Sequence, residues 1–267
     1  MSAGEIHALL RGEPFGWLFL ALIGAILGSF GNVVIYRLPR QLSLIRPRSR
    51  CPRCASTIAF YDNIPIASYL LLGGRCRRCR ASISPRYPLV ELLGAGLSVA
   101  AVGLAPTPAM AVVDTVLALA LLVVLFIDYD FQIIPDAITL PGVVAGILVA
   151  LWGPLPVRDS LIGVAVGGGG LFLVAEGYRR LAHREGLGMG DVKLMGMIGA
   201  FLGWQGALIT LVLGSLVGSL VGGALIASRR GGRYTALPFG SFLAPAAWAA
   251  LFFGSALWQA YLRLLSH

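Results

Sequence analysis

Long blocks of apolar residues, separated by short polar segments, are the main pattern along the chain. A transmembrane helix needs about 20 mostly apolar residues, and eight blocks approach or exceed this length. They cover residues 16–36, 87–105, 109–127, 137–153, 160–178, 192–205, 207–227 and 238–262. The pattern predicts an all-α polytopic membrane protein with about eight transmembrane helices.

The amino-acid composition supports this prediction. Of the 267 residues, 57% are hydrophobic and 12% are charged, whereas a soluble domain has roughly 25% charged residues. These values exclude a cytosolic enzyme, a disordered chain and a DNA-binding module. The net charge of +9 would favour nucleic acid as the partner of a soluble protein, but in a membrane protein its distribution matters more. We therefore expect a lipid bilayer, and no nucleic acid, as a partner.

Most of the basic residues lie on one side of the predicted helices. Alternating the spans puts residues 37–86, 179–184 and 229–233 on the same side, and these segments hold 17 of the 21 basic residues. The other side keeps three, so the positive-inside rule makes the basic side cytoplasmic and both termini outward. Acidic residues accompany Arg11 before the first span, which predicts an uncleaved anchor rather than a signal peptide.

The segment 37–86 divides the chain into three predicted parts. These are a first helix with an outward N-terminus (1–36), a cytoplasmic loop (37–86) and a transmembrane core (87–267). The loop holds 11 basic residues against one acid, Asp62. This excess is either a topology signal alone or also a means of docking the loop on anionic lipid headgroups.

All four cysteines lie in this loop, in the motifs Cys51-Pro-Arg-Cys54 and Cys76-Arg-Arg-Cys79. Two such turns can bring four thiolates to one ion, and a closed shell of this kind is typical of structural zinc. Two disulfides are the main alternative, but cytoplasmic thiols stay reduced. A redox pair is the lesser alternative, because the surrounding βαβ pattern is missing. We therefore predict a structural zinc ion held by Cys51, Cys54, Cys76 and Cys79.

Five acidic residues lie at or near the predicted cytoplasmic helix ends: Glu91, Asp128, Asp130, Asp136 and Asp191. An ionisable group at such a depth is costly unless it is paired or hydrated, so function is its default interpretation. Asp128 follows the apolar run of the third span, and Asp191 closes a Gly-x-Gly-Asp motif before the sixth. If the two meet, one can be ionised and activate water while the other is protonated and polarises a peptide carbonyl.

The residues around Asp191 fit this hypothesis. Gly188 and Gly190 allow a substrate backbone to approach closely and permit a non-helical turn. Lys193 follows at the helix end as a supporting residue. Acid–base catalysis needs hydrogen-bond reach or one intervening water, so we expect the cytoplasmic ends of the third and sixth spans to be adjacent, with the carboxylates within about 10 Å.

The other acids have structural alternatives. Asp136 follows Pro135 and suits an N-cap or first-turn acid of the fourth span, and Asp130 suits a solvated loop. Asp114 and Glu176 fit polar helix contacts or a proton path. The Gly-x-Gly-Asp motif is weak by itself, since small residues also pack transmembrane helices.

Five segments, taken in order, share a pattern with a known family. They are Gly28-Ser-Phe-Gly-Asn-Val-Val-Ile-Tyr-Arg-Leu-Pro39, the paired cysteine loop, Pro85-Arg-Tyr-Pro-Leu-Val-Glu91, Ile127-Asp-Tyr-Asp-Phe-Gln-Ile-Ile-Pro-Asp-Ala-Ile-Thr-Leu-Pro141 and Gly186-Leu-Gly-Met-Gly-Asp-Val-Lys-Leu-Met-Gly-Met-Ile-Gly-Ala-Phe-Leu-Gly-Trp204. With these segments the chain resembles the bifunctional type IV prepilin peptidases, which are polytopic aspartyl proteases.

The resemblance implies that the short basic leader of type IV prepilins or type II secretion pseudopilins is cleaved after a glycine at the cytoplasmic face of the bacterial inner membrane. It also implies methylation of the new N-terminal residue with S-adenosylmethionine, with which the zinc loop is associated. The catalytic aspartates fall by position on Asp128 and Asp191, with Asp130 and Asp136 competing for the first role. Glu91, beside the zinc loop, is a candidate cofactor-binding residue or a buried acid hydrogen-bonded between helices.

Two other functions fit the same residues. In the first, the chain is a peptidase without methyl transfer, and the zinc loop only docks a substrate or partner. In the second, it is a proton-coupled transporter in which the acids relay protons. Acids lying deeper in the spans would favour the transporter.

Overall fold

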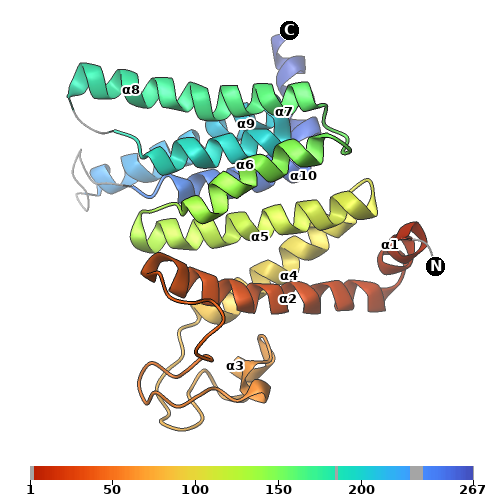
Figure 1. The fold of residues 1–267 in the computed structure, drawn as a ribbon, viewed down its shortest axis with the longest axis vertical. Coiled ribbons are helices and arrows are strands. Elements are labelled where there is room, and N and C mark those ends of the chain that lie inside the picture. The colour runs from red at the N-terminus through yellow and green to blue at the C-terminus, as the bar shows by residue number, and fades with distance from the viewer. Residues whose placement is uncertain (1–2, 184–185, 229–236, 267) are drawn as a thin grey trace. The chain divides into compact units, whose positions relative to one another are not determined.

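The computed structural model describes residues 3–183, 186–228 and 237–266. The basic residues Arg184, Arg229, Arg230 and Arg233, which contribute to the predicted charge asymmetry, lie outside these ranges. Over the described ranges the chain is helical, with two isolated β-bridges and no strand. It forms two compact units, Met1–Val123 and Val124–His267, which are described separately (Figure 1).

The helices are bounded as follows. The first part of the chain contains α1 (Ala3–Gly12), α2 (Pro14–Arg37), η1 (Leu38–Arg40), η2 (Phe60–Asn63), α3 (Ala67–Leu71), α4 (Arg86–Leu104) and α5 (Pro108–Phe131). The remainder contains α6 (Asp136–Ala150), α7 (Val157–Val164), η3 (Ala165–Gly169), α8 (Gly170–Ala182), α9 (Met189–Ala227) and α10 (Gly240–Leu265).

The predicted all-α membrane fold is confirmed. Within the described residues, six helices are long and apolar enough to cross a membrane, and α6 is a shorter apolar helix. The 39-residue α9 is kinked at Gly203, whose φ of 70° and ψ of −177° are not helical, and this kink separates the predicted spans 192–205 and 207–227. Helix ends differ from the prediction by a few residues because helices continue past their apolar blocks, as in the last turn of α8, which contains two arginines.

In the first unit, α2 and α4 pack along a line of glycines. A Cβ added at Gly28 would lie 2.8 Å from the Val90 carbonyl oxygen, and one at Gly94 would lie 3.0 Å from the Gly28 Cα. Backbones approach this closely only where no side chain stands between them. The loop 38–85 joins the end of α2 to the start of α4 and so projects from one end of this helix pair (Figure 1).

In the second unit, the first half of α9 packs on α7 and η3 in the same way. The backbones of Gly163 in α7 and Gly199 in α9 meet so closely that a Cβ at either position would clash with the other residue. The Ser160 hydroxyl donates to the Ala200 carbonyl oxygen at 2.7 Å, which fixes the register of the two helices. As a result, residues 194–200 of α9 are all buried.

Gly199→Ala is expected to lower the free energy of unfolding by about 1–3 kcal/mol, because the added methyl group must push α7 and α9 apart. The control is Gly177→Ala in α8, where nothing lies within 4 Å of the added Cβ. This control should leave stability unchanged or raise it by up to about 1 kcal/mol, the difference in helix propensity. Circular dichroism of the purified protein during SDS titration measures both, and equal stability of the two variants would contradict the backbone contact.

Candidate active site and metal centre

Asp128 lies in the last turn of α5 and is buried, with 4% of its surface exposed. The helix ends at Phe131, and the next residue, Gln132, is left-handed with a φ of 53°. The Gln132 backbone N–H donates to the Asp128 carbonyl oxygen at 2.8 Å. A left-handed residue is a common helix end, and here it places the carboxylate of Asp128 where α5 stops.

The Asp128 carboxylate faces the first turn of α10. Its Oδ2 accepts hydrogen bonds from the Ser241 backbone N–H at 2.8 Å and from the Ser241 hydroxyl at 3.2 Å, and the Gly240 backbone N–H donates to the same carboxylate. The hydroxyl also lies 3.0 Å from the Leu125 carbonyl oxygen, so its proton is shared. The N-terminus of a helix carries positive partial charge, so α10 offers donors and a favourable field to an anion at this position.

Asp191 lies in the first turn of α9 and is also buried, with 8% of its surface exposed. The backbone N–H of Gly188 donates to its carboxylate. The other carboxylate oxygen, Oδ1, is buried without a hydrogen-bond partner among the described residues. A buried oxygen without a partner is costly, and such an atom is typical of a position that a water or a substrate completes.

Ile134, in the turn between α5 and α6, brings the two aspartate segments together. A Cβ added at Gly190 would lie 2.9 Å from the Ile134 Cβ, and one at Gly240 would lie 2.7 Å from the Ile134 Cδ1. The starts of α9 and α10 therefore contact the same side chain. The carboxylates of Asp128 and Asp191 are close enough to interact electrostatically.

The two glycines before Asp191 differ in conformation. Gly188 is extended and precedes α9, whereas Gly190 is helical, so the non-helical turn predicted around both glycines occurs only at Gly188. Gly190 is required for space instead, because a side chain there would overlap Ile134.

The other aspartates near helix ends, and Glu176, lie in ion pairs or are at least partly exposed. Asp136 is a first-turn acid of α6, and both its carboxylate oxygens lie 2.7 Å from Lys193 Nζ, which joins α6 to α9. Glu176 pairs with the arginines three and four residues further along α8. Asp130 is exposed at the end of α5, and Asp114 is half-buried in the same helix. Among the described residues, Asp128 and Asp191 are the two buried aspartates.

The two cysteine pairs form two turns of the same geometry. In each, the backbone N–H of the first cysteine donates to the carbonyl oxygen five residues on, at 2.9 Å for Cys51 and 2.8 Å for Cys76. The residue after the second cysteine is left-handed in both turns, with φ of 54° at Ala55 and 58° at Arg80. These turns direct the thiols of the two pairs to a common point.

The four thiols converge, with every Sγ within 4.8 Å of the others. Cys51 Sγ and Cys79 Sγ are 3.8 Å apart, whereas a disulfide requires about 2.0 Å. All four cysteines are free, so the disulfide alternative is not the arrangement observed. The cluster has the number, type and spacing of donors that could hold one metal ion in a tetrahedral shell.

The thiols differ in their readiness to ionise. Hydrogen bonds from the Ser56 hydroxyl, 3.0 Å away, and from the Ser56 backbone lower the pKa of Cys54 to about 6. Hydrogen bonds from the Cys79 and Arg78 backbones also lower the pKa of Cys76. The Ala81 backbone N–H favours the Cys79 thiolate, but burial and the neighbouring thiols raise the pKa of Cys79 to about 11. A bound cation would therefore displace at least the Cys79 proton at neutral pH.

Glu91 is buried in α4, next to the cysteine loop. Its Oε2 accepts the backbone N–H of Ile66 at 2.7 Å. Ile66 has a φ of 62°, which is rare for a β-branched residue. Glu91 therefore holds a strained loop residue against a membrane helix. Of the two predictions for Glu91, this arrangement resembles the buried, hydrogen-bonded acid, although its partner is a loop backbone and not a second helix.

Two family models cover the regions in which these clusters lie. Residues 22–104, which contain the cysteines and Glu91, match the bacterial peptidase A24 N-terminal domain. Residues 115–223, which contain both buried aspartates, match the type IV leader peptidase family. The chain is also 41% identical to the prepilin leader peptidase/N-methyltransferase of Aeromonas salmonicida, over 96% of this chain and 98% of the relative. The chain belongs to the type IV leader peptidase family.

Other members of the type IV leader peptidase family match over similar lengths. The proteins of the same name from Pseudomonas putida and Pseudomonas aeruginosa are 38% and 36% identical, and at least 95% of each chain is covered. No solved structure matches the chain.

Gly240 and Ser241 are functional-site residues that the sequence did not predict. They lie after the segment matched to the leader peptidase family and 112 or more residues from Asp128, so no local motif connects them to it. The available signal was the Pro-Phe-Gly-Ser run at the start of the last apolar block. Pro and Gly mark a helix start there, and a helix start is a place where an anion can be bound.

Proposed function

We propose that the chain cleaves the leader peptide of type IV prepilins or pseudopilins after a glycine and then methylates the new N-terminal residue with S-adenosylmethionine. The observation that carries the peptidase proposal is that Asp128 and Asp191, alone among the described aspartates, are buried at adjoining helix ends. The printed names of the relatives support both activities.

The hydrogen bonds suggest different roles for the two aspartates. Ser241 and Gly240 direct donors at Asp128, and donors stabilise a carboxylate. We assign Asp128 as the general base that takes a proton from water as the oxygen attacks the scissile carbonyl. Asp191, whose Oδ1 has no partner among the described residues, is the acid that donates a proton to the carbonyl oxygen. When the C–N bond breaks, Asp128 passes the proton it took from water to the leaving amine nitrogen, and Asp191 regains its proton from a hydroxyl of the tetrahedral intermediate.

Lys193 and Asp136 support the site without taking part in the reaction. Their ion pair joins the first turns of α6 and α9, and Asp191 lies two residues before Lys193. In this proposal Asp136 is neutralised by Lys193 and Asp130 is exposed rather than buried, so we assign the role of base to Asp128.

We propose zinc as the ion of the cysteine cluster. Four ligands with Zn–S bonds of about 2.3 Å in a tetrahedron lie about 3.8 Å from one another, which is the separation between Cys51 Sγ and Cys79 Sγ. Four protein ligands make a closed structural site. Such an ion would fix both cysteine turns and would leave no open position for a substrate.

The charge distribution supports a cytoplasmic active site in the bacterial inner membrane. Asp128 lies at the end of α5 that, in the predicted topology, faces the side rich in arginine. Leader peptides that have not crossed the membrane would meet the aspartates on this side.

Co-expression with a prepilin tests the proposal. Intact-mass spectrometry of the pilin should show loss of the leader and addition of one methyl group. Leader loss without methylation would support a peptidase alone. An unprocessed prepilin together with proton-driven solute uptake into proteoliposomes would replace the proposal by the transporter.

Gly240→Ala is expected to lower the cleavage rate by about 10- to 100-fold. The new methyl carbon would lie 3.1 Å from Asp128 Oδ2 and 2.7 Å from Ile134 Cδ1, and small displacements of catalytic groups are costly at this scale. Gly254→Ala in the same helix is the control, because nothing lies within 4 Å of its Cβ. Initial rates on a purified prepilin measure both, and full activity of Gly240→Ala would show that α10 does not position Asp128.

A further inference from the structure

The cysteine loop carries a group of exposed apolar side chains that the proposed chemistry does not use. They lie in η2, α3 and the turn between them, here called the 60–71 segment. Leu71 is 86% exposed and Phe60 is 78% exposed, and Ile64 and Leu70 are also exposed. Isolated exposed apolar residues are ordinary, but several within one short segment indicate a contact surface.

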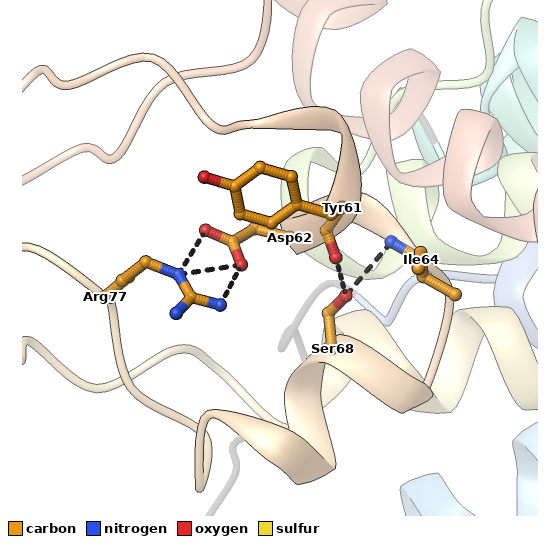
Figure 2. Close-up of polar contacts among 5 residues, drawn as sticks. All are labelled: Tyr61, Asp62, Ile64, Ser68 and Arg77. Carbon is orange, nitrogen blue, oxygen red and sulfur yellow. Dashed lines mark hydrogen bonds and ion pairs between the residues drawn. The ribbon is translucent and has the colours of Figure 1, made fainter.

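Polar contacts fix the shape of this segment (Figure 2). The Ser68 hydroxyl donates to the Tyr61 carbonyl oxygen at 2.9 Å and accepts the Ile64 backbone N–H at 3.1 Å, so it ties η2 to α3. Arg77 Nε and Nη2 donate to the Asp62 carboxylate at 2.6 to 3.0 Å, and its guanidinium lies 5.5 Å from the centre of the Tyr61 ring. The apolar residues are therefore presented by a preformed scaffold attached to the second cysteine turn.

A contact with α4 gives the depth of the segment. Ile66 donates its backbone N–H to Glu91 at 2.7 Å, and Glu91 lies five residues after Arg86, the first residue of this candidate span. At 1.5 Å per residue this is about 7.5 Å along the helix. Amphipathic segments lie about 5–10 Å deep at the boundary of headgroups and acyl chains, and the Ile66 backbone lies at that depth when it is counted from the first residue of the candidate span.

The charge of the loop identifies the kind of surface that fits. Asp62 is the only acid between residues 37 and 86, and Arg77 neutralises it. Arg75, Arg78 and Arg80 are exposed on and beside the same cysteine turn. Exposed arginines beside exposed leucine and phenylalanine are typical of segments that bind anionic bilayers, because the cations reach phosphates while the apolar groups enter the acyl region.

We propose that the 60–71 segment inserts Phe60, Ile64, Leu70 and Leu71 into the cytoplasmic leaflet of an anionic phospholipid bilayer, with the neighbouring arginines at the lipid phosphates. The segment would thereby anchor the cysteine module at the membrane surface. This inference concerns lipid contact alone and does not depend on peptidase or methyltransferase activity.

Photocrosslinking of the full-length, metal-loaded protein tests the inference. A benzophenone amino acid replaces Leu71 in one sample and Thr57, an exposed residue of the other cysteine turn that is not one of these arginines, in the control. Both proteins are reconstituted in vesicles of phosphatidylglycerol and phosphatidylethanolamine and irradiated. We expect several-fold more phospholipid adduct, detected by intact mass, at position 71 than at position 57. Equal yields, or a crosslink from position 71 to protein, would overturn the proposal.

A second measurement tests the role of the anionic lipid. Repeating the experiment at position 71 in vesicles of phosphatidylcholine alone keeps the headgroup phosphates and the apolar core but removes the net negative charge of the surface. The adduct yield at position 71 should fall because a surface without net negative charge attracts the arginines less. An unchanged yield would refute the contribution of the arginines to lipid binding. This outcome does not depend on whether the protein cleaves a prepilin.

Discussion

Replacing Asp191 by asparagine is expected to lower the rate of leader cleavage by about a thousandfold, as is usual for loss of a general acid or base. Asparagine keeps the size of the side chain and can still accept the Gly188 N–H, so the start of α9 should remain folded. Asp128→Asn should have a comparable effect, because an amide cannot take a proton from water. Single-turnover cleavage of a purified prepilin in detergent measures both variants.

Asp130→Asn is the matched control for Asp128→Asn. Both residues are in the last turn of α5, but Asp130 is exposed whereas Asp128 is buried. The Asp130 variant should cleave within about threefold of wild type, because a surface substitution usually changes stability by no more than about 0.5 kcal/mol and the residue lies outside the proposed reaction. Cleavage lost with Asp130→Asn and retained with Asp128→Asn would transfer the role of base to Asp130. The double variant of Asp128 and Asp191 should be little slower than either single variant, because residues that act as a unit are not additive.

Replacing Cys76 by serine is expected to remove the bound zinc and to abolish methylation of the cleaved pilin, while leader cleavage continues. In our proposal the metal ion holds the two cysteine turns together, and small metal-binding modules commonly unfold without their ion. Metal analysis should fall from one zinc per chain to none, and limited proteolysis should become rapid between residues 37 and 86. Arg53→Ser, between two ligands but not one of them, should retain zinc and methylation.

Acid should have the same effect on the metal. Zinc binds thiolates, and protons compete with it, so its affinity falls as the pH falls. With the pKa of Cys54 at about 6 and that of Cys79 at about 11 in the free thiols, binding at neutral pH releases at least the proton of Cys79. Competition with a chromophoric chelator over a range of pH measures this. An affinity that is constant or rises on acidification would exclude a thiolate site.

The sequence was sufficient to predict those parts of the structure that depend on neighbouring residues. Apolar blocks predicted the helices because a bilayer imposes a minimum apolar length. The cysteine turns were predicted because each pair closes within a few residues. Asp128 was selected because it ends an apolar run, and in the structure it is buried where α5 stops. Its catalytic role still stands as a prediction.

Features that depend on distant residues were not predictable. The contact between Ser241 and Asp128 joins two helices whose order in space no local pattern encodes. The tight helix interface of Gly163 and Gly199 was similarly hidden, because a glycine in an apolar block does not reveal which neighbour it faces. Gly190 is helical, although the sequence predicted a non-helical turn there. That prediction used the conformational freedom of glycine, whereas the structure needs glycine at position 190 only because a side chain would overlap Ile134.

The contact of Gly163 with Gly199 also restricts how α9 can move. The two backbones are in direct contact, with no side chain between them. A rotation of the first half of α9 about its own axis would therefore separate it from α7. Asp191 lies eight residues before Gly199 on the same helix, about 12 Å along its axis at 1.5 Å per residue. The helix that carries this carboxylate is therefore constrained two turns away from it, and a substitution at Gly199 is expected to shift Asp191 without touching it.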